Sequence, residues 1–388
     1  MDKGDGLSRT KKLTGSRNTQ GTVNYQSRIH KFSISFTPNL AANVSSPSAP
    51  NLAITYQDTI LLTDTEDIPL SSLDPTGTQK VRGFPELPLV TYPGDGYGGT
   101  GPGGNNLPLD AEGLVLIPGG GFFISDEYGP YIYRFSKSGK LLSAIAPTDA
   151  YIPLRRGEIS FSSNNPPLYN TSQIPDPKTP QAGRANNQGF EGLTLSPDGR
   201  TLSVALQSAL VQDGGTSDST RRYARMLTYD VTKPDLPKLM KEYVIPLPVF
   251  VNSKNATRVA GQSEIYAVTD TEYLILARDS GKGFGQGPKN TESVYRQIDV
   301  ISTKHAKAID KKAFDRVNGT VAPGGVLDDD IKPARYCPFL DFNVNSELGK
   351  FGLHNGGAED GGLLNEKWES ISVGMFGRSC NKLGRMQN

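Results

Sequence analysis

Residues 112–146 read EGLVLIPGGGFFISDEYGPYIYRFSKSGKLLSAIA, and their pattern indicates the architecture of the whole chain. The stretch begins with a short apolar run after Glu112, turns at a cluster of glycines, and continues through a second apolar run that ends in Asp126 and Glu127. Two further alternating runs follow, YIYRF and KLLSAIA. Short alternating segments bounded by Gly and Pro are typical of β-strands, so this stretch predicts four consecutive antiparallel strands.

The same order of segments recurs along the chain. Residues 191–248 contain EGLTLS, TLSVALQS, RMLTYDV and KEYVIPLP, and residues 264–303 contain EIYAVT, EYLILARDS and YRQIDVIST. A fourth start is predicted at WESI, which includes Glu369. Repeated units of four antiparallel strands predict an all-β chain, a β-propeller of four-stranded antiparallel blades.

The starting glutamates are spaced more widely than in a compact blade. They lie 79, 73 and 105 residues apart, against roughly 40 to 50 residues for a blade without insertions. We therefore interpret residues 80–110 and 153–189 as excursions between blades. A β-sandwich is the alternative fold, but it offers no reason for a glutamate to begin each unit.

Composition and charge indicate which fold and which partners the chain could have. The 43 glycines and 28 prolines among its 388 residues favour many short strands joined by turns. The chain has a net charge of +1, and residues 1–31 and 376–388 together have a net charge of +8, so the rest of the chain carries a formal charge of −7. An acidic body argues against nucleic acid as a partner and is compatible with bound cations. No run of 18 apolar residues predicts a membrane span.

In a propeller, the first strand of each blade lines the central channel, so the repeated glutamates are expected to converge. The predicted metal ligands are Glu112, Glu191, Glu264, Glu369 and Asp126. Clustered carboxylates repel one another unless a cation or arginines neutralise them, and oxygen-only ligands suit Ca²⁺ or Mg²⁺ better than zinc. The second strands are expected to end at the same face with Glu127, Gln207, and Arg278 beside Asp279. The alternative is that these acids are structural locks that bind neighbouring backbone.

The segments SDEYGPYIYRFSKSGKLL, GRANNQGFEGLTLSPDGRTL, RRYARMLTYDV, ARDSGKG and NEKWESISV resemble the phytase-like family, also called the esterase-like activity of phytase family, and its secreted fungal members in particular. The resemblance covers about residues 18–373, which defines the predicted propeller domain. It implies a β-propeller whose repeated acids have been proposed to serve phosphodiester or ester hydrolysis. The chain has only three histidines and no RHGxRxP motif, which argues against a histidine acid phosphatase.

The resulting hypothesis is a metal-assisted hydrolase of small phosphate or carboxylate esters. A Ca²⁺-type ion would be held by the channel-mouth glutamates, Glu127 or Asp279 would act as general base, and Arg278 or Arg225 would steady the anionic group. The rival hypothesis is a non-catalytic propeller that binds a glycan, peptide or protein. A third is a lactonase-like Ca²⁺ propeller.

The ends of the chain differ from the rest of it. Residues 1–17 predict a basic disordered leader without an apolar signal segment, and residues 374–388 predict a basic tail outside the resemblance. The strand count predicts an incomplete ring with exposed edges. Family resemblance and four N-x-[ST] sequons, at Asn43, Asn170, Asn255 and Asn318, predict that full-length relatives are extracellular glycoproteins, whereas this chain, without the signal segment, is not expected to be exported.

Overall fold

The computed structural model describes residues 25–95, 100–164, 174–309 and 312–373, and the chain in these ranges is mostly β. The predicted leader 1–17, the predicted tail 374–388 and the sequon at Asn170 lie outside the described residues. Within the described residues, helices are confined to α1 (Lys312–Asp315), α2 (Asn345–Leu348) and short 3₁₀ turns at Asp149–Tyr151, Val211–Asp213, Pro323–Gly325 and Gly349–Phe351. No helix in these ranges has the length and apolar character needed to cross a membrane.

Three four-stranded antiparallel sheets follow one another in the chain, which confirms the predicted four-strand unit. The first comprises β6 (Ala111–Leu116), β7 (Phe122–Asp126), β8 (Ile132–Phe135) and β9 (Leu141–Ile145). The second comprises β12 (Phe190–Leu195), β13 (Thr201–Leu206), β14 (Tyr223–Asp230) and β15 (Lys238–Pro246). The third comprises β18 (Gly261–Ala267), β19 (Glu272–Arg278), β20 (Arg296–Ser302) and β21 (Arg335–Asp341).

The remaining strands form smaller sheets. A three-stranded sheet comprises β3 (Gly77–Lys80), β4 (Glu86–Tyr92) and β5 (Gly104–Asn106), so the segment interpreted as an excursion at 80–110 contains paired strands of its own. Separate hairpins comprise β1 (Arg28–Phe36) with β2 (Leu52–Leu61), β10 (Leu154–Arg155) with β11 (Glu158–Ile159), and β16 (Val249–Val251) with β17 (Thr257–Val259). No strand begins at Glu369 in the described residues, contrary to the predicted fourth start.

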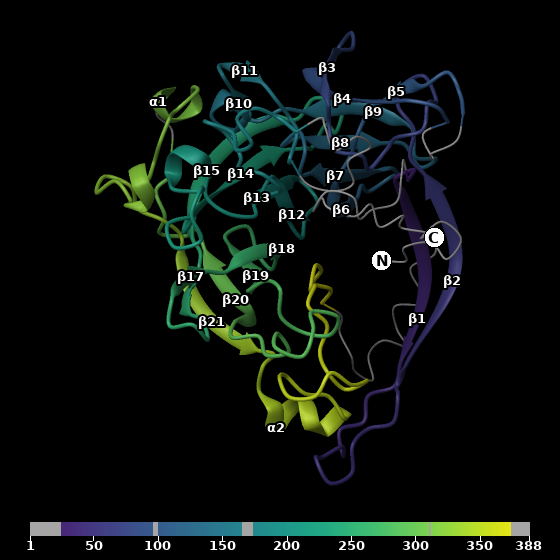
Figure 1. Ribbon diagram of the computed structural model, residues 1–388, viewed down its shortest axis with the longest axis vertical. Coiled ribbons are helices and arrows are strands. Elements are labelled where there is room, and N and C mark those ends of the chain that lie inside the picture. Colours follow the sequence, from purple (N-terminus) through teal and green to yellow (C-terminus); the bar gives the residue numbers. More distant parts are fainter. Residues whose placement is uncertain (1–24, 96–99, 165–173, 310–311, 374–388) are drawn as a thin grey trace.

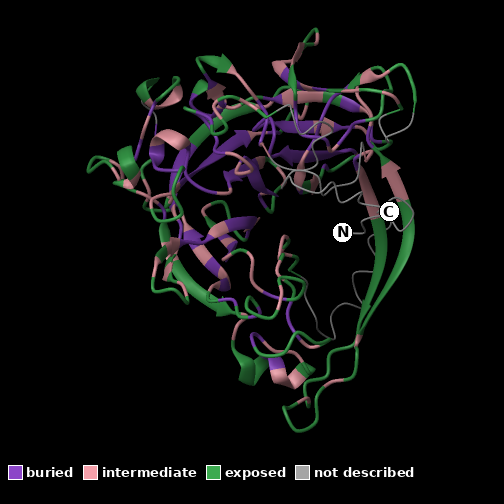
Figure 2. Ribbon diagram, in the orientation of Figure 1, coloured by how far each residue is buried: buried purple, intermediate pink, exposed green. Residues whose placement is uncertain are grey.

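The three large sheets are arranged around a common centre, with their first strands innermost (Figure 1). β12 lies beside both β6 and β18. Apolar side chains fill the space between successive sheets: Phe123 and Ile132 pack against Phe190 and Leu206, and the next interface continues through Met226 and Ile275. Buried residues therefore concentrate in these sheets, whereas β1 and β2 are largely exposed (Figure 2).

Glycine permits the close approach of the first strands. A Cβ added at Gly113 would lie 2.5 Å from Leu193 Cβ, and one added at Gly192 would lie 2.7 Å from Ile265 N. Both distances are too short for a real carbon contact, so each glycine sits where the neighbouring strand passes. The EGL tripeptides at 112–114 and 191–193 thus combine a glutamate with the contact that joins one sheet to the next.

We predict that Gly192→Ala lowers the free energy of unfolding by about 1–3 kcal/mol, because the added methyl group must displace the backbone of β18. Gly77→Ala is the matched control, since a Cβ at this strand glycine would meet nothing within 4 Å. Urea denaturation of both variants measures the difference. Equal stability of the two variants would contradict the close-contact role of Gly192.

Candidate metal centre

A β-bulge in each first strand determines which side chain faces the centre. The pairing of β12 with β13 shifts between Phe190 and Gly192, and the pairing of β18 with β19 shifts between Gln262 and Glu264. Glu191 and Ser263 are therefore the bulged residues of their strands. β6 shifts over the same interval, between Ala111 and Leu114. A bulge re-aims a side chain, which accounts for the position of Glu191.

Matching the three sheets by these registers puts Glu112, Glu191 and Ser263 at one equivalent position. Glu264 instead occupies the position that Gly113 and Gly192 hold in the other sheets. Its Oε1 accepts hydrogen bonds from Leu193 N at 3.1 Å and from Ile265 N at 2.9 Å. The structure therefore places this predicted ligand between β12 and β18, where it joins two strands.

Five carboxylates converge in two overlapping groups of three. Asp110, Glu112 and Glu127 form one group, and Glu112, Glu191 and Glu369 form the other, with one oxygen from each residue lying within 4.8 Å of the others in its group. Glu112 belongs to both groups. Because Ca²⁺ binds oxygen at about 2.3–2.6 Å, two ligands of one ion are at most about 5 Å apart, and both groups satisfy this limit.

The second strand of each large sheet also delivers a residue to this cluster. By the same register, Glu127, Gln207 and Arg278 are equivalent. Glu127 belongs to the first group, Gln207 Nε2 donates to Glu191 Oε1 at 2.8 Å, and Arg278 Nη2 lies 2.8 Å from Glu369 Oε1. The expectation that these strand ends share one face is consistent with these contacts.

Two of the carboxylates are buried with one oxygen unpartnered. Glu127 is 1% exposed and Glu191 is 2% exposed. In the described part of the chain, Glu127 Oε1 and Glu191 Oε2 have no hydrogen-bond partner. A buried carboxylate oxygen without a donor is unfavourable unless a proton or a cation occupies the space in front of it.

Burial and mutual repulsion raise the pKa values of the cluster. Burial, followed by the negative charge of Glu369, raises the pKa of Glu191 to about 8, although Gln207 opposes the shift. Burial raises the pKa of Asp110 to about 6, opposed by a hydrogen bond with Glu127. Burial and then Glu191 raise the pKa of both Glu112 and Glu127 well above its usual range. Without a cation, the cluster therefore retains protons near neutral pH.

Asp126 has a different environment from its neighbour Glu127. Its Oδ1 accepts hydrogen bonds from Asp110 N at 2.9 Å and from Tyr128 N at 3.2 Å, and its Oδ2 accepts one from Gly129 N at 3.0 Å. Asp126 is outside both carboxylate groups. These contacts identify it as the residue that fixes the turn carrying Glu127.

Two predicted catalytic residues lie apart from the groups. Asp279 accepts hydrogen bonds from Ser293 Oγ and Val294 N, both at 2.7 Å. Arg225 is fully buried and pairs with Asp213 at 2.8 Å and Glu242 at 3.2 Å. Both residues therefore hold loops and strands together in this structure, and neither belongs to the carboxylate groups.

Sequence reasoning missed three residues of the site. Asp110 lies two positions before Glu112, and this spacing was the available signal, because alternate residues of an extended chain share a side. Lys367 Nζ lies 3.5 Å from Glu369 Oε1. Arg184 is fully buried and donates to the carbonyl of Tyr128 at 2.9 and 2.7 Å. Its positive charge opposes the rise in the pKa of Glu127 that burial and Glu191 cause. No local pattern marked Arg184, because its partners are backbone carbonyls of distant segments.

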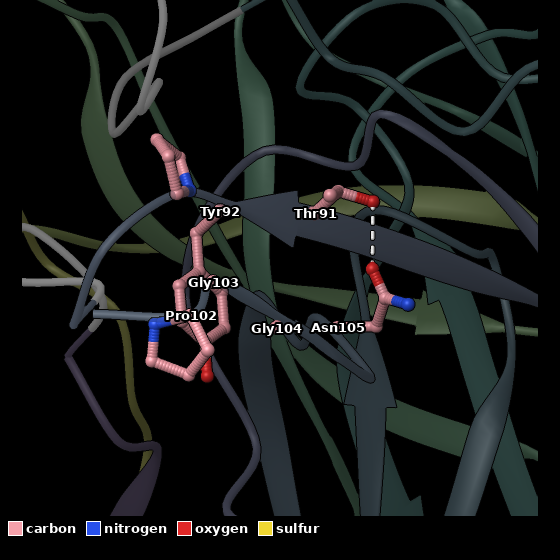
Figure 3. A pocket seen from close by; sticks show the side chains of 7 residues that line it. Thr91, Tyr92, Pro102, Gly103, Gly104 and Asn105 are labelled. Atoms are coloured by element: carbon pink, nitrogen blue, oxygen red, sulfur yellow. Dashed lines mark hydrogen bonds between the residues drawn. The ribbon is translucent and has the colours of Figure 1, made fainter.

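A surface pocket of about 570 Å³ lies at the end of β4 and β5 (Figure 3). Its lining includes Tyr92 and Pro102, and a hydrogen bond of 2.8 Å joins Thr91 to Asn105. The described residues that line it include no carboxylate and no residue of the cluster. The carboxylate groups therefore lie outside this pocket.

Comparison with known proteins identifies the family. The sequence matches the phytase-like family, described as having the esterase-like activity of phytase, over residues 20–342. The chain belongs to the phytase-like family. It is also 51% identical over 365 residues to an uncharacterized secreted protein of Arthroderma benhamiae, a match that covers 92% of this chain and 71% of that protein.

Similarity to solved structures is weak. The match to U3-55K has a TM-score of 0.23 at 10% identity and covers 55% of this chain and 60% of that one. The match to a protein from Lactobacillus plantarum has a TM-score of 0.24 at 8% identity and covers 73% and 82% of the two chains. The family assignment rests on sequence.

We predict that the metal-free protein loses stability as pH rises from about 5 to 8. Raised carboxyl pKa values mean that the folded state binds more protons than the unfolded state across this range, so deprotonation favours unfolding. In EDTA the melting temperature should fall by roughly 5 °C or more. Glu191→Gln should make the melting temperature less dependent on pH. Glu272→Gln, at an exposed glutamate, should leave the pH dependence unchanged. A melting temperature that rises toward pH 8 in EDTA would contradict the prediction.

Proposed function

We propose that this chain is a hydrolase of small phosphate or carboxylate esters that works with a hard divalent cation such as Ca²⁺. The observation that carries the proposal is the pair of buried, unpartnered oxygens on Glu127 and Glu191 within the carboxylate groups. Family membership supports a hydrolase, because the family is described by the esterase-like activity of phytase.

The donor set fits such a cation. Both groups consist of carboxylates alone, without histidine or cysteine. Oxygen-only donors favour Ca²⁺, Mg²⁺ or Mn²⁺ over zinc. We propose Glu112, Glu191 and Glu369 as the ligands. Glu264 is not proposed as a ligand, because its side chain accepts hydrogen bonds from backbone N–H groups. A bound cation of this kind would polarise the ester oxygen and lower the pKa of a coordinated water.

The chain's own basic residues suit an anionic ester group next to the carboxylates. Arg278 is buried, and its guanidinium is held by Glu369 at 2.8 Å and by the carbonyl of Trp368 at 3.3 Å. A pocket of about 500 Å³ is lined by Lys367, Trp368 and Glu369. We propose that the substrate enters this pocket and that Arg278 and Lys367 orient its anionic group. Arg225 has no part in this role.

Glu127 is the candidate for the residue that acts beside the cation. Its Oε1 is free to accept a proton from water or to bind a cation. Arg184 holds the carbonyl of Tyr128, the next residue, and Asp126 accepts the amide hydrogens of the same turn. These contacts fix the backbone from which Glu127 extends. Both carboxylate oxygens of Asp279 accept hydrogen bonds, so Asp279 has no part in this role.

We further propose that the successive four-stranded sheets form blades of a β-propeller and that the protein acts outside the cell. The inward position of β6, β12 and β18 supports the first proposal (Figure 1). The secreted relative from Arthroderma benhamiae supports the second. The exposed sequons at Asn43, Asn255 and Asn318 are compatible with glycosylation on that route.

The test is an ester panel of aryl phosphates and aryl carboxylates with purified full-length protein in Ca²⁺ and in EDTA. We predict cation-dependent release of phosphate or alcohol, and a loss on the order of 100-fold in kcat/KM for Glu191→Gln because a ligand is removed. Glu264→Gln is the matched control, since it changes a buried glutamate outside both groups.

Two outcomes would count against the proposal. Absence of turnover on every ester in the presence of Ca²⁺ would favour the non-catalytic binding module, with the acids as structural locks. Equal activity of Glu191→Gln and wild type would place the reaction elsewhere in the molecule.

A further inference from the structure

The cluster contains more carboxylates than the three proposed as ligands of one cation. Each group supplies three oxygens that can reach a single ion, and the groups share only Glu112. A carboxylate has two oxygens, so Glu112 can bind one ion through each of them. The remaining ligands, Asp110 with Glu127 and Glu191 with Glu369, belong to different groups.

Each group contains its own buried, unpartnered oxygen. Glu127, which carries the orphaned Oε1, belongs to the first group, and Glu191, which carries the orphaned Oε2, belongs to the second. One ion could explain both only if it contacted Glu127 and Glu191 together, and these two residues belong to different groups. The two orphaned oxygens therefore point to two cations, one in each group.

The positive charge of the protein is unevenly distributed between the groups. Glu369 pairs with Arg278 at 2.8 Å and with Lys367 at 3.5 Å, so the second group already has ionic partners. Within the described ranges, Asp110, Glu112 and Glu127 form no ion pair with a basic side chain. The guanidinium of Arg184 acts on Glu127 only at longer range, because its hydrogen bonds go to backbone carbonyls.

We propose that the cluster binds two divalent cations, with the carboxylate of Glu112 as the bridging ligand. The second cation is held by Asp110, Glu112 and Glu127, in addition to the one held by Glu112, Glu191 and Glu369. This inference rests on the proposed function, because it concerns the same site, and it makes Glu127 a ligand in place of a proton acceptor. Paired cations about 3.5–4 Å apart are a known arrangement for displacement at phosphate esters.

The test is calorimetric titration of Ca²⁺ into the full-length protein after removal of metal with EDTA and dialysis. We predict two equivalents for wild type and for the control Glu264→Gln. Glu127→Gln should retain one equivalent, Glu191→Gln should retain one, and Glu112→Gln should lose at least one and weaken what remains. Asp110→Asn tests the first group if Glu127→Gln does not fold, as judged by its circular dichroism and cooperative melt.

A spectroscopic measurement tests the bridge separately. Mn²⁺ has unpaired electrons, so two equivalents should give an exchange-coupled electron paramagnetic resonance spectrum in wild type and an uncoupled one in Glu112→Gln. Two equivalents without coupling in wild type would overturn the bridging role of Glu112.

The outcomes separate this inference from the proposed function. One equivalent in wild type, unchanged by Glu127→Gln, would overturn the paired site and leave the single-cation hydrolase standing. No binding of Ca²⁺ or Mn²⁺ would overturn both. Two equivalents in wild type with ester hydrolysis absent would support the paired site and overturn the hydrolase.

Discussion

The organisation of the molecular centre follows from the close contact between the first strands of neighbouring sheets. Gly113 passes against Leu193 and Gly192 passes against Ile265, at distances that a side chain would prevent. Ser125 extends the contact, since its hydroxyl accepts from Gly113 N at 2.8 Å and donates to the carbonyl of Glu191 at 3.0 Å. Because the strands lie this close, the side chains of their bulged residues must share one small volume.

That volume contains carboxylates in two different physical situations. Asp126 and Glu264 are surrounded by backbone N–H donors, and such bonds stabilise a buried carboxylate at the cost of its freedom to bind anything else. Among the residues that the structure describes, none donates a hydrogen bond to Glu127 Oε1 or to Glu191 Oε2. The division between structural acids and candidate functional acids therefore follows the supply of backbone donors. The structural-lock interpretation suits Asp126 and Glu264, and the cation-binding proposal concerns the others.

Sequence patterns were sufficient for the repeated strands and for the convergence of Glu112 and Glu191, because both follow from periodicity and from the order of segments. Glu369 lies beside them although no strand begins there in the described residues. The patterns were insufficient at Glu264. The third repeat, EIYAVT, looks in register with EGLVLI and EGLTLS, but the bulge at Ser263 shifts it by one residue. A shift of one residue moves a side chain to the other face of a strand. No spacing in the sequence indicates where a bulge falls.

Long-range partners were the second limit. Arg225 resembles an exposed phosphate ligand in RRYAR, yet it is neutralised by Asp213 and Glu242, 12 and 17 positions away. Arg184 lies 56 positions from the Tyr128 carbonyl that it binds. Pairings over such separations depend on how the sheets pack and leave no local trace.

Ser263 has a consequence for any ligand bound at the centre. It stands where the first two sheets each place a glutamate, so the third sheet contributes no carboxylate at this position. Arg278, on the strand paired with the one that carries Ser263, adds positive charge on that side. A scaffold of similar units thus presents a polar, handed environment. A ligand with one charged end and one neutral end would therefore meet different groups in its two orientations.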